Sequence, residues 1–388
     1  MPATITNADT GRVSGAVGTG AVSLPGPVVT QQNGAPRLPF RRATVERCSI
    51  LPAESGTLGA AFIPIERTIE GTGFLYAIRL QLVATAAGNI ANVAFTEDGP
   101  WNALNSVILR DVNGEILNVP NGYYLYLSNL AQKNYAARWL DQSTLFSSVT
   151  GTGGTGGSFT VWYDVLIGTN RRDLLGILGN QDRAQKYSLR TDIAALSQIY
   201  ATAPTAAPTF VLNKLYENYS VPLPVGPSGI GQQVLPDGYG TVHFTTVTTS
   251  DSVPAGGTTV NHYLRRIGNT VRFIILVFRS NGSRATADAN APTLLTFKVG
   301  DDTVFTETYA MRRSKMFERY GFDWPAGVLV YETLHDFSSD AGFELGDDYW
   351  HTQALVNAQF QIAYPSGFGA TNNSLNIVTD DLVFTAPQ

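Results

Sequence analysis

A strand–turn–strand–helix pattern occurs twice in this sequence, and it limits the folds that the chain can adopt. In the first copy, Asn105 to Arg110 is an apolar run of strand type, and Asn113-Gly114 supplies the positive φ angles of a two-residue hairpin turn. Glu115 to Val119 then predicts the returning strand. From Tyr124 to Tyr135 the apolar spacing changes to about 3.6 residues, which predicts a helix that Asn121 caps.

The second copy begins about half a chain length later. Leu294 to Gly300 predicts a strand, Asp301-Asp302 a turn, and Thr303 to Thr306 a short returning strand. Tyr309 to Tyr320 then follows helical spacing, with Thr308 as the cap. The two copies share little residue identity, so what repeats is the order of the elements. This order predicts two similar units within one chain.

Strands dominate the remainder of the sequence. Alternating apolar and polar residues predict strands at Phe74 to Val83 and at Ala354 to Ala363. Thr270 to Arg279 is apolar on both faces, which predicts a central strand buried on both sides. The other predicted strands are 159–167, 187–193, 209–219, 241–249, 327–334 and 375–384. The total is about seven strands in the first half and about eight in the second.

A segment dense in proline and glycine, residues 221–238, marks the best internal boundary. We therefore predict an all-β protein of two tandem eight-stranded antiparallel jelly-roll sandwiches, each with a short helix-containing insert. The expected units are a flexible N-terminal arm (1–40), a first jelly roll (41–220), and a linker with the second jelly roll (221–388).

Composition narrows the classes of function. Charged residues make up 15% of the 388 residues, against a usual ~25%, and the net charge is −5. This balance argues against specific binding of a nucleic-acid backbone. Cys48 is the single cysteine, so no intrachain disulfide is possible, and we expect it to be buried or half-buried. Neither a signal peptide nor an apolar stretch of membrane-spanning length is visible, so we expect synthesis in the host cytoplasm.

Motifs of catalysis and cofactor binding are incomplete. Gly151 to Gly156 fits G-x-G-x-x-G, but a strand is predicted after it in place of the required helix, which favours a surface loop over residues 141–158. The histidines and the adjacent aspartates lack metal-ligand or dyad spacing. They are His243, His262, His335, His351, Asp301-Asp302, Asp347-Asp348 and Asp380-Asp381. We expect structural hydrogen bonds for the histidines and turn or loop positions for the aspartates.

No catalytic, cofactor-binding or metal-ligating residue is therefore assigned, and no cofactor is expected. A calcium site at a loop, and a glycosidase pair built from distant carboxylates, stay open. The basic residues at the end of the arm have two interpretations. They form a solvated linker, or they contact a neighbouring subunit, an anionic lipid surface or a genome. These residues are Arg37, Arg41, Arg42 and Arg47.

This arrangement resembles the double jelly-roll major capsid proteins of tailless icosahedral viruses with an internal membrane, the tectivirus type. The resemblance rests on two sandwiches after an arm, on the inserts from Asn105 to Tyr135 and from Leu294 to Tyr320, and on the phrase GPWNALNSVILRDVNGEIL. It implies a structural capsid protein of the virion, not an enzyme, that forms a homotrimeric, pseudo-hexagonal capsomer. It also implies contacts between trimers, contacts with penton or minor capsid proteins, and contact between the basic arm and the inner membrane.

Two other functions stay open. One is a receptor- or carbohydrate-binding spike protein of a virus, for which the tryptophans could form a sugar platform, although we expect them in the core or at interfaces. The other is a jelly-roll carbohydrate-active enzyme. The tryptophans are Trp101, Trp139, Trp162, Trp324 and Trp350. The internal repeat and the flexible arm favour the capsid subunit over both alternatives.

Overall fold

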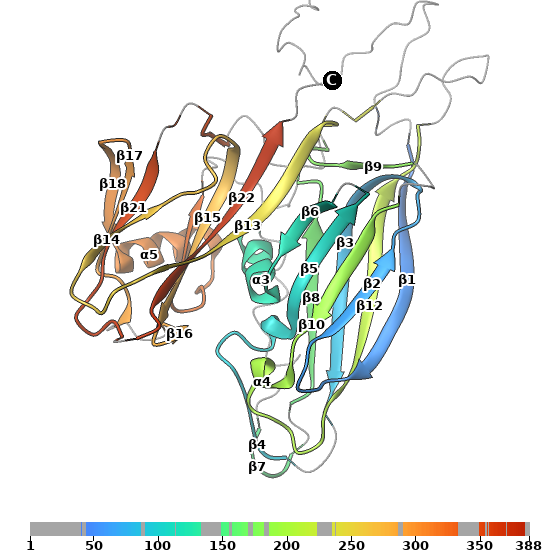
Figure 1. Cartoon of the computed structure of the whole chain (residues 1–388), viewed down its shortest axis with the longest axis horizontal. Helices are drawn as coiled ribbons and strands as arrows, with labels where there is room; N and C mark the ends of the chain where they lie inside the picture. Colours follow the sequence, from blue (N-terminus) through green and yellow to red (C-terminus); the bar gives the residue numbers. More distant parts are fainter. Residues whose placement is uncertain are drawn as a thin grey trace, which may run out of the picture.

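The computed structural model describes residues 40–384, except for 41–43, 87–89, 113, 133–148, 155–156, 170–173, 182–185, 223–234, 237, 286–289, 333–348, 354, 356 and 370. Its described residues form two β-sandwiches side by side, the first blue to green and the second yellow to red in Figure 1. Among them, no helix has both the length and the apolar character that a bilayer crossing requires.

The first sandwich contains two main antiparallel sheets. One has the order β1-β12-β3-β8, with β9 also paired to β3, and the other has the order β2-β10-β5-β6. A small third sheet contains β11, β4 and β7. The strands are Glu46–Thr57 (β1), Ile63–Thr68 (β2), Gly73–Thr85 (β3), Ile90–Phe95 (β4), Leu104–Asp111 (β5), Gly114–Val119 (β6), Val149–Gly154 (β7), Phe159–Leu166 (β8), Leu178–Asn180 (β9), Ser188–Ile193 (β10), Tyr200–Thr202 (β11) and Thr209–Tyr219 (β12).

The second sandwich repeats this plan. One sheet has the order β13-β22-β15, with β16, β19 and β20 also paired to β15, and the other has the order β14-β21-β17-β18. The strands are Thr241–Ser252 (β13), Thr259–Tyr263 (β14), Thr270–Ser280 (β15), Ser283–Arg284 (β16), Leu294–Val299 (β17), Asp302–Thr308 (β18), Val328–Glu332 (β19), Trp350–His351 (β20), Ala358–Ala363 (β21) and Ser374–Phe384 (β22).

The two sandwiches have the same topology. Each contains eight main strands among the described residues: β1, β2, β3, β5, β6, β8, β10 and β12 in the first, and β13, β14, β15, β17, β18, β19, β21 and β22 in the second. We number the eight main strands of each sandwich one to eight along the chain. In both sandwiches the strand order is then 1-8-3-6 in one sheet and 2-7-4-5 in the other. The prediction of an all-β protein of two tandem jelly-roll sandwiches is therefore confirmed.

Each predicted insert is present and each predicted cap is confirmed. The helix after β6 is α3, Gly122–Ala131, and the Asn121 side chain accepts a hydrogen bond from the Tyr123 amide at 2.8 Å. The helix after β18 is α5, Tyr309–Tyr320, and Thr308 accepts from the Met311 amide at 3.2 Å. Two shorter helices, Trp101–Ala103 (η5) and Leu196–Ile199 (α4), belong to the first sandwich.

The first hairpin turn differs from the prediction by one residue. Asp111 faces Gly114 across β5 and β6, so Gly114 is already the first residue of the returning strand and not a central residue of the turn. Gly114 itself has a φ of +140°, which is accessible to glycine because it lacks a Cβ. The predicted turn residue Asn113 and the predicted helical residue Tyr135 lie outside the described residues.

Alternating side chains form the core as the sequence predicts. Leu80 and Leu82 of β3 face Tyr163 and Val161 of β8, and all four are buried inside the first sandwich. Burial of each such side chain contributes about 1.5–3 kcal/mol. The predicted two-sided burial is also confirmed: every residue of β15 is buried except Arg279, which is half-buried.

Three predictions are wrong in detail. Cys48 is exposed, because its side chain lies on the outer side of the edge strand β1 with that of Ile50, whereas Leu51 on the inner side is buried. Part of the predicted loop, Val149–Gly154, is the strand β7, where backbone pairing with β4 outweighs the low strand preference of glycine. The strand predicted at residues 354–363 begins later, at Ala358.

Candidate functional site

A set of polar interactions joins the two sandwiches, and the helix α3 takes part in it. All ten residues of α3 are buried and none is charged. On one side, Asn129 seals the edge strand β8: its side-chain amide donates to the Asp164 carbonyl at 2.8 Å and accepts from the Asp164 amide at 3.0 Å. These bonds satisfy backbone groups that an open sheet edge would leave exposed. The same helix therefore closes the first sandwich and faces the second.

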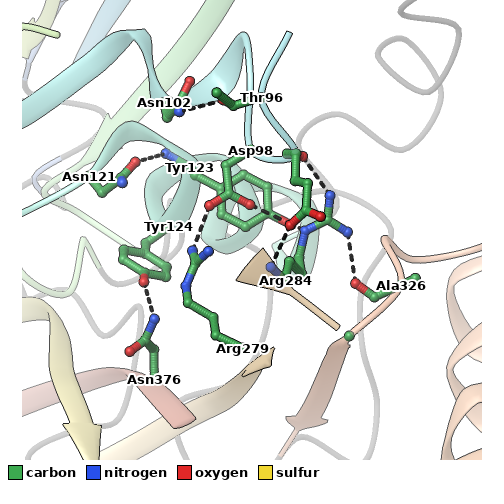
Figure 2. Close-up of polar contacts among 12 residues, drawn as sticks. Thr96, Asp98, Asn102, Asn121, Tyr123, Tyr124, Arg279, Arg284, Ala326 and Asn376 are labelled. Atoms are coloured by element: carbon green, nitrogen blue, oxygen red, sulfur yellow. Dashed lines mark hydrogen bonds and ion pairs between the residues drawn. The ribbon is translucent and has the colours of Figure 1, made fainter. Parts of the chain in front are cut away.

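A cluster of charged residues from both sandwiches lies at this junction, beside Tyr123 of α3 (Figure 2). Asp98 of the first sandwich accepts hydrogen bonds from Arg279 at 2.6 Å and from Arg284 at 3.2 Å, both in the second sandwich. Arg284 also donates to the Ala326 carbonyl at 2.8 Å, and its guanidinium lies 5.6 Å from the Tyr123 ring centre. Burial lowers the pKa of Arg279, but the charges and hydrogen bonds of Asp98 and Tyr124 together outweigh burial, so the net shift is upward.

A neutral contact lies beside the charged cluster. The side-chain amide of Asn376, on β22, donates to the Tyr124 hydroxyl of α3 (Figure 2). At the other end of α3, the Tyr320 hydroxyl of α5 donates to the Ala131 carbonyl at 3.4 Å. Both contacts are buried, so water does not compete for these groups.

The second charged cluster surrounds Asp380 of β22. Arg272 donates to this carboxylate at 2.7 Å, and His243 Nε2 lies 2.9 Å from it. Gln132 of the first sandwich donates to the same carboxylate at 3.4 Å. The other ring nitrogen, His243 Nδ1, lies 2.8 Å from the Leu166 carbonyl of β8. The His243 ring therefore contacts an acceptor in each sandwich and links the two.

The physical environment of Asp380 favours its ionised form. Burial raises the pKa of this carboxyl, but the charges and hydrogen bonds of His243 and Arg272 outweigh burial, so the pKa lies below its ordinary value. The neighbouring Asp381 points to the other side of β22, where Arg266 donates at 2.8 Å and Asn269 at 2.6 Å. Burial raises the pKa of Asp381, and these partners only partly oppose it.

The predicted turn or loop position of Asp380-Asp381 is therefore wrong. Both aspartates lie within β22 and are fully buried. Their partners come from β13, β15 and the segment before β15, which are distant in sequence. Of the exposed pair Asp301-Asp302, Asp301 lies in the turn as predicted, whereas Asp302 is the first residue of β18; Asp347-Asp348 lies outside the described residues.

The described histidines make hydrogen bonds at separate places. His262 is buried in the second sandwich between the Asp251 carboxylate at 3.1 Å and the Tyr364 hydroxyl at 2.9 Å. Burial lowers its pKa, and the hydrogen bond and charge of Asp251 oppose that shift. His351 Nδ1 lies 3.1 Å from the Thr270 hydroxyl, and His335 lies outside the described residues. Within the described chain, no group of three His, Cys, Asp or Glu side chains could hold a metal ion.

The four tryptophans that the structure describes do not gather on one surface. Trp101 and Trp324 are buried, and Trp101 stacks on Tyr126 with ring centres 3.9 Å apart. Trp350 packs edge-on against Phe297 of the core, and Trp162 is half-buried on β8. Trp139 lies outside the described residues.

One residue of the basic cluster can be placed. Arg47 is exposed on β1, whereas Arg37, Arg41 and Arg42 lie outside the described residues. Phe40 is buried nearby against Phe74, with ring centres 5.1 Å apart.

The fold is similar to those of viral capsid proteins. The chain matches the major capsid protein of Sulfolobus turreted icosahedral virus with 13% identity and a TM-score of 0.61, over 88% of this chain and 97% of that chain. It matches the PBCV-1 virus capsid with 12% identity and a TM-score of 0.60, over 89% and 95% of the two chains. For the major capsid protein of bacteriophage PM2 the values are 9% identity and 0.50, over 89% and 99%.

No protein-family model matches the sequence, and no curated protein sequence matches it. At the identities found, the structural likeness establishes the fold: the chain has the double jelly roll of these capsid proteins over nearly the full length of each.

Proposed function

We propose that this protein is a structural major capsid protein that associates with copies of itself to build an icosahedral virion shell. One observation carries the proposal: the same eight-strand order occurs twice in one chain. Three viral capsid proteins share this fold over at least 95% of their own chains. The trimer is the oligomer that this plan favours, because three chains with two similar sandwiches each present six similar sides.

The surface chemistry supports assembly. The chain has few charges for its length, and the outward residues of β21, for example, include the uncharged Gln359 and Gln361. Such groups are hydrated in the free subunit and are less costly to bury than charges when subunits meet. The low charge therefore suits a subunit that buries large lateral surfaces.

The test is the mass and morphology of the full chain in solution. We expect a stable species of three times the 41.7 kDa chain mass, and shell-like particles by electron microscopy at assembly conditions. A protein that stays a monomer at every concentration, and instead binds or hydrolyses a glycan, would favour the spike or carbohydrate-active alternative.

The finer parts of the proposal concern partners and unit boundaries. We propose the units 1–40, 41–220 and 221–388, lateral contacts between trimers, and contacts with penton or minor capsid proteins. We also propose that the basic arm with Arg37, Arg41, Arg42 and Arg47 contacts an inner membrane, because clustered arginines contribute about 1 kcal/mol each at an anionic lipid surface.

Vesicle binding tests the membrane contact. Vesicles that contain anionic lipid should bind the full chain in low salt, and the double variant Arg41→Ser with Arg42→Ser should bind about 10-fold or more less tightly. The matched control replaces two exposed arginines elsewhere, Arg67→Ser with Arg265→Ser. Equal losses in both variants would indicate a general charge effect and no role for the arm.

A further inference from the structure

A lysine occupies a core position in the last main strand of the first sandwich. In β12 the side chains of Phe210, Leu212 and Tyr216 point into the core, and Lys214 follows the same alternation between them. The Lys214 side chain is 1% exposed. Among the residues that the structure describes, its nitrogen Nζ has no hydrogen-bond partner. This amine therefore loses its hydration without a replacement, which is costly for a polar group and more so for a charged one.

One carboxyl group lies close to the buried amine. Glu54 belongs to β1, the first main strand, and is paired with Leu212 of β12, whereas Lys214 is paired with Leu51. A β-bulge between Leu51 and Glu54 shifts the alternation and turns Glu54 to the inner side of the sheet. The distance from Lys214 Nζ to Glu54 Oε1 is 3.9 Å, which is too long for a hydrogen bond.

A guanidinium group contacts the same carboxyl oxygen. Arg67 of β2 donates a hydrogen bond from Nε to Glu54 Oε1. The Arg67 side chain is 50% exposed and that of Glu54 is 21% exposed, so the carboxyl group lies between a buried amine and the solvent. The positive charge of Arg67 makes the carboxyl carbon of Glu54 more electrophilic, and a water molecule released there can leave towards the solvent.

The surroundings favour a reaction between the two groups. Burial lowers the pKa of Lys214 and the Arg67 charge lowers it further, although the Glu54 charge opposes both. A lower pKa increases the share of neutral amine, which is the nucleophilic form. Neighbouring strands hold the amine and the carboxyl group together, so their effective concentration is high. The interior also disfavours two separate charges more than it disfavours one neutral amide.

We propose that Lys214 and Glu54 form an isopeptide bond between the last and the first main strand of the first sandwich. Lys214 Nζ bonds to the side-chain carbon Cδ of Glu54, and the bond from Cδ to Oε2 breaks. Of the three ammonium hydrogens, two leave with Oε2 as one water molecule and one stays on the amide nitrogen, so no co-reactant is needed. Arg67 stabilises the negative charge on Oε1 in the tetrahedral intermediate.

The bond goes beyond the proposed function and does not depend on it. It closes the chain covalently from residue 54 to residue 214, which includes most of the first sandwich. β1 is an edge strand that pairs only with β12 among the described strands, and an edge strand can separate from its sheet without disrupting the rest. The bond keeps β1 attached to β12 when the sandwich opens locally.

Mass spectrometry of the denatured full chain tests the proposal. We expect the unmodified chain to be lighter than its sequence by one water molecule, and Lys214→Met and Glu54→Leu each to have the full mass of their own sequence. Trypsin should not cleave after Lys214, and the digest should contain one branched peptide that joins Lys214 to Glu54. In a time course after cell-free synthesis, Arg67→Ala should form the bond about 10-fold more slowly. Circular dichroism checks that each variant is folded.

Two other lysine–glutamate pairs are matched controls within the same digest. Lys186 lies 3.0 Å from Glu70 and Lys315 lies 2.7 Å from Glu307, so both pairs are closer than the proposed pair. Their lysine side chains are 32% and 56% exposed, and we expect trypsin to cleave after both and no branched peptide from either. A branched peptide from these pairs as well would contradict the role of burial.

The mass also separates this inference from the proposed function. An unmodified chain that keeps its full mass, both when fresh and after prolonged incubation, overturns the isopeptide bond. Loss of water that persists in Lys214→Met overturns it too, because the loss then arises elsewhere in the chain. A chain that carries the bond but stays a monomer keeps this inference and rejects the capsid function. A trimer that lacks the bond keeps the capsid function and rejects this inference.

Discussion

The helices α3 and α5 have the same position in their sandwiches but different surroundings. Comparing them shows which properties of a helix follow from its position and which from the residues that cover it. Both follow a hairpin, both are capped by the residue before the helix, and both seal an edge strand. Yet α3 has no charged residue and is buried, whereas α5 is basic and exposes Met311 and Phe317. The fold therefore determines where each helix lies. Whether a neighbouring sandwich covers the helix determines whether its residues are apolar or charged.

The strands β3 and β15 show the same difference. They are the third main strands of their sandwiches, and both pair with the eighth and the sixth main strands. β15 carries apolar side chains towards both faces because the first sandwich covers its outer side. β3 carries Arg79 and Gln81 on its outer side, as a surface that meets water in the free subunit requires.

The largest expected effect comes from a change in the buried contact between the two sandwiches. Asp380→Asn removes the negative charge that faces Arg272, which is 2% exposed. An unpaired buried charge costs about 3–5 kcal/mol, so the urea midpoint should fall strongly. The control Asp302→Asn, at an exposed position of β18, should change the midpoint little. A loss below about 1 kcal/mol for Asp380→Asn would mean that this cluster does not stabilise the junction.

A smaller effect is expected from the helices themselves. Asn129→Ala removes two buried hydrogen bonds to β8 and should lower the free energy of unfolding by about 1–3 kcal/mol. A change on the exposed side of α5, Ser314→Ala, should stay within about 0.5 kcal/mol because Ser314 is exposed. Chemical unfolding of both variants measures the difference. Equal effects would contradict the contrast between a buried and an open helix.

The smallest effect concerns pH and lies within the second sandwich, away from the junction. Burial lowers the pKa of His262 below its ordinary 6.5 in the folded chain. As the pH falls through 6.5, the unfolded chain takes up a proton at this histidine before the folded chain does, so stability decreases. The Tm should fall between pH 7.5 and 5.5, and His262→Gln should reduce that fall. An unchanged pH dependence in the variant would assign the acid sensitivity to other groups.

Most of the strands and helix caps could be predicted from the sequence, but little of the contact between the two sandwiches could be. The range of β12 and the caps Asn121 and Thr308 follow from alternation and from capping chemistry. The short strands β2 and β14 were not predicted, because five or six residues give too little alternation to recognise. β7 was not predicted because its glycines have a low strand preference.

The junction could not be predicted because its partners are distant along the chain. Asp98 and Arg279 are 181 residues apart, and no pattern in the sequence identifies them as partners. One signal was available: Gly122–Ala131 lacks any charged residue, and a helix that is apolar on every side is buried. That signal predicts burial of α3, but it does not identify the surface that buries it.

A structure of the assembled full chain by electron cryomicroscopy tests the central claim most directly. We expect three copies whose six sandwiches have similar neighbours around the threefold axis. An assembly with another number of copies, or one in which the two sandwiches of a chain have unrelated neighbours, would contradict the claim that the two sandwiches present similar sides.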